Sequence, residues 1–180
     1  MLTITIPATE EFNESTGEFL YTKEQTLQLE HSLLSISKWE SKWCKPFLSR
    51  EGKTYEETID YIKCMTLNKH VDDNVYACLT EANLKAIDDY IGAPMTATYF
   101  SNQDKGRKSN EQITSELIYY WMIALNIPFE CQKWHLNRLL TLVKVCNVKN
   151  EPPKKMSKRD VMSRNAALNA ARRKQHNTRG

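Results

Sequence analysis

Large apolar residues recur every three or four positions over most of this 180-residue chain, and this spacing restricts the fold more than any other feature. The longest such series, Leu29, Leu33, Ile36, Trp39 and Trp43, places its members on one face of a helix about five turns long, which Pro46 ends. The chain has only 5 Gly and 6 Pro. Such scarcity argues against turn-rich β-sandwiches and against nucleotide-binding folds built on glycine loops, so the chain is predicted to be mainly α-helical.

The N-terminal segment carries a strand pattern instead. Leu2, Ile4 and Ile6 alternate with threonines, residues 13–17 form a turn signal, and residues 18–22 read as a returning strand. We therefore predict a β-hairpin over residues 2–22. An isolated hairpin is marginal in water, so this one is expected to pack on the helices or to pair with another chain. Thr22, with Gln25 three residues later, is predicted to cap the first helix.

Capping signals also place the next helices. Thr54 with Glu57 has the capping-box spacing and predicts a helix over 55–67, whose apolar face holds Ile59, Ile62 and Met65. A short helix is expected at 74–79, and Thr80 is predicted to cap another over 81–91, with Gly92 at the C′ position.

Residues 111–146 form the most apolar part of the chain. The first predicted helix, 111–125, has a stripe made of Ile113, Leu117, Tyr120, Trp121, Ala124 and Leu125. Pro128 is predicted to open the second, which runs to about Cys146. The polar residues of this second helix form one narrow stripe, so we expect it to be buried around most of its circumference. Residues 101–110 have no apolar member and mark a possible sub-boundary.

The C-terminal segment differs in charge from the rest. Residues 151–180 carry nine Lys or Arg and two acids, a net charge of +7, whereas residues 1–150 carry −4. A linker is expected to lead into a helix from Ser157 to about Gln175, which has few large apolar residues and should bury little on its own monomer. The predicted fold class is α+β: residues 1–150 form a mainly α domain with a small N-terminal β-hairpin, and residues 151–180 add a basic helix.

Catalytic and metal chemistry have weak support. Cys131 and His135 are spaced to share a helix face, but zinc needs three or four ligands and the pair Cys64 and His70 has different spacing. The five cysteines are scattered, which favours reduced thiols. Acidic doublets are explained by helix starts and exposed faces, and nucleophile motifs and phosphate-binding glycine loops are missing. We expect no catalytic residue, no cofactor and no metal, hence no enzyme.

Two groups of residues are candidates for binding partners. Trp121 and Trp134 are explained either by a hydrophobic core or by a groove that holds a partner segment. Arg164, Arg172, Arg173 and Lys174 lie on the basic helix, which could contact nucleic acid, dock on an acidic protein or simply solubilise the chain end. Its cations do not form one clean stripe and no aromatic residue lies among them, so nucleic acid is the less favoured partner.

Membrane insertion and secretion are not indicated. The longest apolar run, Leu117–Leu125, has about half of the ~18 residues that a membrane span requires. The opening sequence MLTITIPATEEF lacks the basic and apolar regions of a signal peptide.

The stretch from Thr114 to Leu140, TSELIYYWMIALNIPFECQKWHLNRLL, resembles a family of tailed-bacteriophage proteins regarded as tail assembly chaperones. The opening MLTITIPATEEF, the run YTKEQTLQLEH at 21–31 and the run MSRNAALN at 162–169 fit the same family.

The resemblance implies a protein of the host cell cytoplasm that binds the long helical tape-measure protein, keeps it soluble and helps to recruit tail-tube subunits. It implies no individual binding residues, because the family offers no residue-level motif. A structural virion component, such as a connector or minor tail protein, and a nucleic-acid-binding protein are the alternatives. A homo-oligomer is compatible with each of them.

Overall fold

The computed structural model describes residues 1–13, 18–100, 112–150 and 157–177, leaving aside the side chains of residues 11–21. The chain divides into two compact units, Met1–Asn147 and Val148–Gly180. The helices of the described part are α1 (Leu33–Trp43), α2 (Tyr55–Met65), α3 (Asn74–Ala77), α4 (Glu81–Gly92), α5 (Ser115–Ala124), the 3₁₀ helix η1 (Phe129–Lys133), α6 (Leu136–Asn150) and α7 (Lys158–His176). The predicted fold class, mainly α with a small N-terminal β structure, is confirmed.

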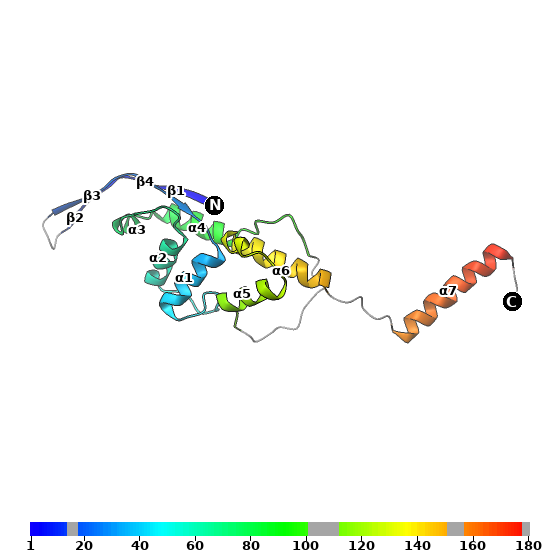
Figure 1. Ribbon diagram of the computed structural model, residues 1–180. Coiled ribbons are helices and arrows are strands. Elements are labelled where there is room, and N and C mark those ends of the chain that lie inside the picture. The colour runs from blue at the N-terminus through cyan, green and yellow to red at the C-terminus, as the bar shows by residue number, and fades with distance from the viewer. Residues whose placement is uncertain (14–17, 101–111, 151–156, 178–180) are drawn as a thin grey trace. The chain divides into compact units, whose positions relative to one another are not determined.

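The N-terminal strands pair differently from the predicted hairpin. Strand β1 (Leu2–Ile6) pairs antiparallel with β4 (Gln25–Leu29), and β2 (Thr9–Asn13) pairs antiparallel with β3 (Glu18–Thr22). Figure 1 shows the two pairs following one another along one long ribbon, with β2 and β3 at its far end. The expected turn falls largely on residues 14–17, which lie outside the described residues.

The prediction that Thr22 caps a helix is wrong. Leu27 and Leu29 alternate with polar residues and pair with Ile4 and Leu2. Ile4, Ile6, Leu27 and Leu29 are all buried. Because alternate residues of a strand face the same side, pairing as strands buries all four of them against the helices. This burial outweighs the helix-capping signal at Thr22. Helix α1 begins later, at Leu33, and the hydroxyl of its N-cap Ser32 accepts from the Ser35 N–H in a capping box.

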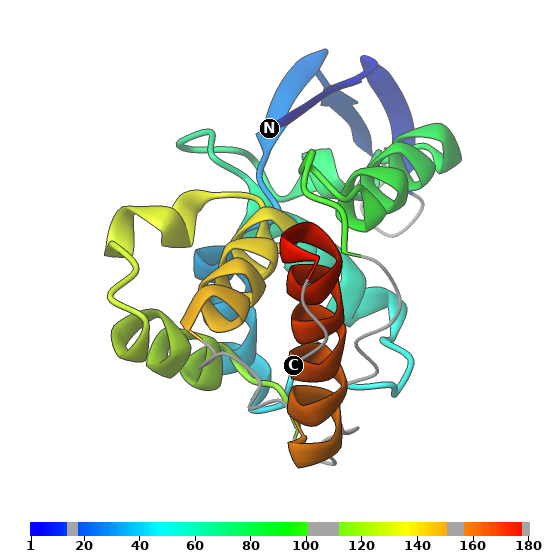
Figure 2. The same ribbon diagram turned by 90° about the vertical axis from the view of Figure 1, so that its right-hand side faces the viewer.

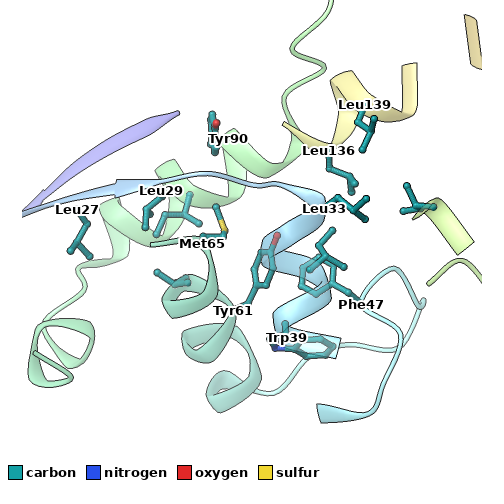
Figure 3. Packing of buried hydrophobic residues seen from close by; sticks show 14 of the residues in the cluster. Leu27, Leu29, Leu33, Trp39, Phe47, Tyr61, Met65, Tyr90, Leu136 and Leu139 are labelled. Carbon is teal, nitrogen blue, oxygen red and sulfur yellow. The ribbon is translucent and has the colours of Figure 1, made fainter. Parts of the chain in front are cut away.

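The core lies where β4, α1 and α2 meet. Leu33, Ile36 and Trp39 on α1 are buried, as their spacing predicts. The Trp39 indole N–H donates to the Glu57 carbonyl oxygen at 2.9 Å, which satisfies the one polar atom of this buried side chain. Figure 3 shows the rings of Phe47 and Tyr61 beside α1, with Leu27 and Leu29 further along the same core.

The caps of α2, α4 and α7 agree with the sequence. Thr54 and Glu57 form a reciprocal capping box, Thr80 accepts from Asn83, and Ser157 accepts from Asp160. The predicted C′ role of Gly92 is wrong. Gly92 is the last residue of α4, and the C-cap Ala93 has a φ of −63°, so no left-handed residue is needed there.

The second helix of the apolar pair is interrupted. Pro128 precedes η1, Trp134 is extended with φ −73° and ψ 160°, and α6 starts only at Leu136. The reason is tertiary. The Leu136 N–H donates to the His31 carbonyl oxygen at 2.7 Å, where a continuous helix would have used a local acceptor.

The expected burial of these helices is also wrong. On α6 only the face of Leu136, Leu139 and Val143 is buried. On α5 the buried residues are Ser115, Ile118 and Met122, whereas the predicted stripe member Tyr120 is 64 % exposed and Leu117, Trp121 and Leu125 are half-buried. Both helices are so rich in apolar residues that more than one face matches a core pattern, and periodicity alone does not select between them. The expected loop at 101–110 lies outside the described residues.

Buried Glu40 fixes the start of α5. One carboxylate oxygen accepts from the Phe47 N–H and the other from the Ser115 N–H, both at 2.7 Å. Ser115 is the first residue of α5, so an anion satisfies a backbone donor that has no partner within the helix.

We predict that Glu40→Gln destabilises the first unit by about 2 kcal/mol, because an amide nitrogen must then face a backbone N–H. Urea unfolding followed by tryptophan fluorescence measures this, since all four tryptophans lie between residues 39 and 134. Glu56→Gln, a change at an exposed position of α2, is the control. Equal stability of both variants would contradict the anchoring role.

Candidate partner-binding surface

An apolar surface runs along α5 and η1. Tyr120 and Ile123 on α5 are 64 % and 61 % exposed, and Phe129 on η1 is 53 % exposed. Ala124 on α5 is also exposed. Figure 2 shows α5 and η1 along one outer side of the first unit, at the left of the view. We call Tyr120, Ile123, Ala124 and Phe129 the α5–η1 surface.

The local fold explains why these side chains face outward. Ser115, Ile118 and Met122 turn the opposite side of α5 into the core, so residues half a turn away must face solvent. Most residues of α5 are apolar. Because only one side of the helix is buried, some of its apolar residues must lie on the exposed side. Clustered exposed apolar residues of this kind mark sites of protein contact more often than scattered ones do.

The chain between α5 and η1 is held tightly. Asn126 has a positive φ of 53°, a conformation that asparagine tolerates well, and this turns the chain back. The Ile127 N–H then donates to the Met122 carbonyl oxygen at 2.8 Å, and the Tyr119 hydroxyl donates to the Gln132 side-chain oxygen at 2.9 Å. These bonds join the two helices, so the surface is formed before any partner arrives.

Two acidic side chains, Glu116 and Glu130, are exposed on the same two helices. Hydrogen bonds from its own backbone N–H and from the Thr114 hydroxyl lower the pKa of Glu116, which lies in the first turn of α5. This carboxylate is therefore ionised at neutral pH. A partner with apolar residues flanked by cations would match such a surface.

The tryptophans predicted to contact a partner are only half-buried. Trp121 lies on α5 and Trp134 at the break before α6, and both pack against the core. The Arg138 guanidinium stands 4.2 Å from the Trp134 ring centre, a cation–π contact that already occupies one side of the ring. Ile123 and Phe129 are not among the predicted partner-binding residues, and Tyr120 belongs to the predicted apolar stripe of this helix.

The other predicted partner residues, Arg164, Arg172, Arg173 and Lys174, all lie on α7 in the second unit. All four are exposed, and α7 has no buried residue, as expected for a helix that buries little.

A buried polar cluster lies around His31, just before α1, and His135, just before α6. Their ring centres are 5.0 Å apart, and His31 Nδ1 is 2.5 Å from the Tyr61 hydroxyl. His135 Nε2 lies 3.0 Å from the Tyr90 carbonyl oxygen, and the Asn137 N–H approaches Nδ1 at 3.3 Å. These two contacts orient the ring, with Nε2 facing an acceptor and Nδ1 facing a donor.

This cluster resembles a catalytic constellation only in its residue types. His31 and His135 are 2 % and 5 % exposed, so a substrate has no direct access to them. Burial raises the pKa of the Tyr61 phenol, which keeps it neutral. Each polar atom named here has a protein partner, so the cluster joins the segment after β4 to α2, α4 and α6.

The pKa of His31 is lowered to about 4, first by burial and then by the neighbouring His135 ring. The unfolded chain has an ordinary histidine pKa near 6.5, so it takes up a proton at a higher pH than the folded chain does. The stabilisation is therefore complete above pH 6.5, and it is lost as the pH falls from 6.5 to 4.

We expect a loss of roughly 3 kcal/mol over this range, measured by urea unfolding at a series of pH values. His31→Gln should flatten the profile between pH 6.5 and 4, whereas His70→Gln, at an exposed position, should leave it unchanged. A wild-type stability that stays constant in this range would rule out a neutral buried His31.

Metal ligands do not gather in the described part of the chain, where no group of three His, Cys, Asp or Glu side chains could hold an ion. His135 is occupied by the Tyr90 carbonyl oxygen, as described above. Burial raises the pKa of the Cys131 thiol and keeps it protonated, although a thiolate is the form that binds metals.

An open groove of about 400 Å³ lies beside α2. Its charged residues are largely paired with each other: Lys42 forms an ion pair with Asp60, and Lys63 with Asp73 at 2.7 Å. Asp60 also accepts from the Trp43 indole N–H at 2.9 Å. These partners already hold both aspartates, so the α5–η1 surface is the stronger candidate for function.

None of the helices in residues 1–13, 18–100, 112–150 and 157–177 combines the length and the hydropathy that a membrane span requires. Comparisons of the chain with protein-family models, curated proteins and solved structures found no match. The function proposed below is therefore based on the surface geometry and on the resemblance at residues 114–140.

Proposed function

We propose that this protein is a non-catalytic assembly chaperone that holds an amphipathic helix of its client on the α5–η1 surface. The resemblance to tail assembly chaperones implies that the client is a phage tape-measure protein. We propose that the client is bound in the host cytoplasm before tail-tube subunits are recruited. The single observation that carries the proposal is the exposure of Tyr120, Ile123 and Phe129 together on two joined helices.

The chemistry of the surface fits such a client. An amphipathic helix binds through large side chains spaced three or four residues apart, and it needs an apolar surface held in a fixed shape. The Tyr119–Gln132 hydrogen bond and the Ile127–Met122 backbone bond supply that fixed shape. A preformed surface limits the entropy lost on binding, which favours a chaperone that must capture a long and aggregation-prone helix.

The surface also lies inside the stretch that carries the resemblance. Residues 114–140 include the whole of α5 and η1 and the start of α6. Substitution of Tyr120 or Phe129 by alanine would not open a cavity in the core, since both side chains are more than half exposed. Loss of binding in such variants can therefore be separated from loss of folding.

We predict that co-expression with the chain raises the soluble fraction of the tape-measure protein and yields a complex on gel filtration. Tyr120→Ala and Phe129→Ala should each weaken that complex by roughly thirtyfold, the effect of removing an anchor residue from an interface. The dissociation constant is measured by calorimetry with a client fragment.

Leu67→Ala is the matched control, since Leu67 is 54 % exposed but lies outside α5 and η1. It should bind like the wild type. A complex that forms but tolerates both surface variants would keep the chaperone function and reject this surface as its site. An unchanged client solubility with no complex would reject the function.

A structural role in the virion is the second candidate, and the strands favour it. The β2–β3 pair is a two-stranded antiparallel ribbon, and such a ribbon can accept a further strand from a neighbouring subunit. Mass spectrometry of purified virions distinguishes the two roles, because stoichiometric copies indicate a structural component and absence indicates a chaperone.

A further inference from the structure

Helix α7 is a 19-residue helix with no buried residue, and its formation is explained by local signals alone. Ser157 caps it, Asp160 lies in the first turn, and four alanines favour the helical state. It carries six Lys or Arg and one Asp, a net charge of +5 with His176 neutral. The α5–η1 surface does not explain why this polar helix carries such an excess of positive charge.

One side of α7 carries a row of hydrogen-bonding side chains. Lys158, Asn165, Asn169, Arg172 and His176 follow at intervals of 7, 4, 3 and 4, so they share one face. The exposed Met162 lies on this face between Lys158 and Asn165, so the row is unbroken only from Asn165 to His176. The cations alone do not form a stripe, but the two asparagines extend the row.

We propose that α7 binds double-stranded DNA, with this row facing the base edges in the major groove. A helix is 10–12 Å wide with its side chains, and the B-DNA major groove is about 12 Å wide. Asparagine pairs with adenine through two hydrogen bonds, and arginine does so with guanine. The positive charge of α7 complements the phosphates, and counterion release supplies the binding free energy.

The positions of the cations on α7 are better explained by binding of a ligand than by stabilisation of the helix. Arg173, Lys174 and His176 lie in the last turn, where they also stabilise the helix dipole. Lys158 and Arg159 lie in the first turn, where a cation opposes the dipole. Helix stability therefore does not explain these two, whereas contact with DNA does. The deep, narrow major groove of double-stranded RNA does not admit a helix, so DNA is the matching duplex.

The test uses the full chain and fluorescence anisotropy with a labelled 30-bp duplex. We expect an affinity loss of about a thousandfold between 50 and 200 mM salt, as for six phosphate contacts. Arg159→Gln/Arg173→Gln/Lys174→Gln, which leaves the row intact, should reduce the salt slope by about three. Lys69→Gln/Lys85→Gln/Lys133→Gln removes the same charge at exposed positions of the first unit and should leave the slope unchanged.

Base reading is tested separately by selection from a random duplex pool. The wild type should enrich a preferred sequence, and Asn165→Ala/Asn169→Ala should lose the preference for adenine in that sequence while keeping salt-dependent binding. Alanine favours helix, so circular dichroism should show unchanged helicity. Equal affinity for double-stranded RNA or for polyglutamate would overturn the proposal, as would the absence of any enriched sequence. An acidic protein would then be the better partner for α7. None of these outcomes bears on the α5–η1 surface.

Discussion

The first unit depends on one cross-connection, between the segment that follows β4 and the segment that precedes α6. The His31 carbonyl oxygen accepts from the Leu136 N–H, Ser32 forms a β-bridge with His135, and the two histidine rings pack against each other. These residues are about a hundred positions apart in sequence. The connection joins the N-terminal strands to the last helix of the unit, and Tyr61 and Tyr90 from α2 and α4 complete it.

Burying the polar rings of this connection costs desolvation free energy, which hydrogen bonds to the rings offset. A charged imidazole in this position would require several kcal/mol of desolvation, so the pKa of His31 is lowered, and each of the two rings has a protein partner. Glu40 follows the same rule, because its buried carboxylate accepts two backbone N–H groups. The unit therefore combines an apolar core with a few satisfied polar anchors that set the positions of its helices.

The α5–η1 surface is a consequence of those anchors. Once Glu40 fixes Ser115 and the His31–Leu136 bond fixes the start of α6, α5 has only one side against the core. Its remaining apolar residues must face outward. A chain that served no partner could place polar residues there at little cost in stability, so the exposed aromatic residues support the proposal of a protein-binding surface. Helix α7 differs in kind, because it is polar and offers charge and hydrogen bonds.

The helical class, three of the caps and the basic C-terminal helix follow from the sequence, because local interactions dominate them. Thr54 with Glu57 and Ser157 with Asp160 need only their neighbours along the chain. The face of α1 that includes Leu33, Ile36 and Trp39 has a single apolar stripe, so its orientation is also predictable.

Only the tertiary structure decided three other features. Residues 25–29 became a strand because β1 offers a partner for them, and the helix expected from Pro128 broke because His31 offers a distant acceptor. The outward face of α5 was undetermined because most of that helix is apolar. Where a segment carries several apolar faces or competing signals, local preferences differ by about 1 kcal/mol or less, and long-range burial and hydrogen bonds of larger free energy make the choice.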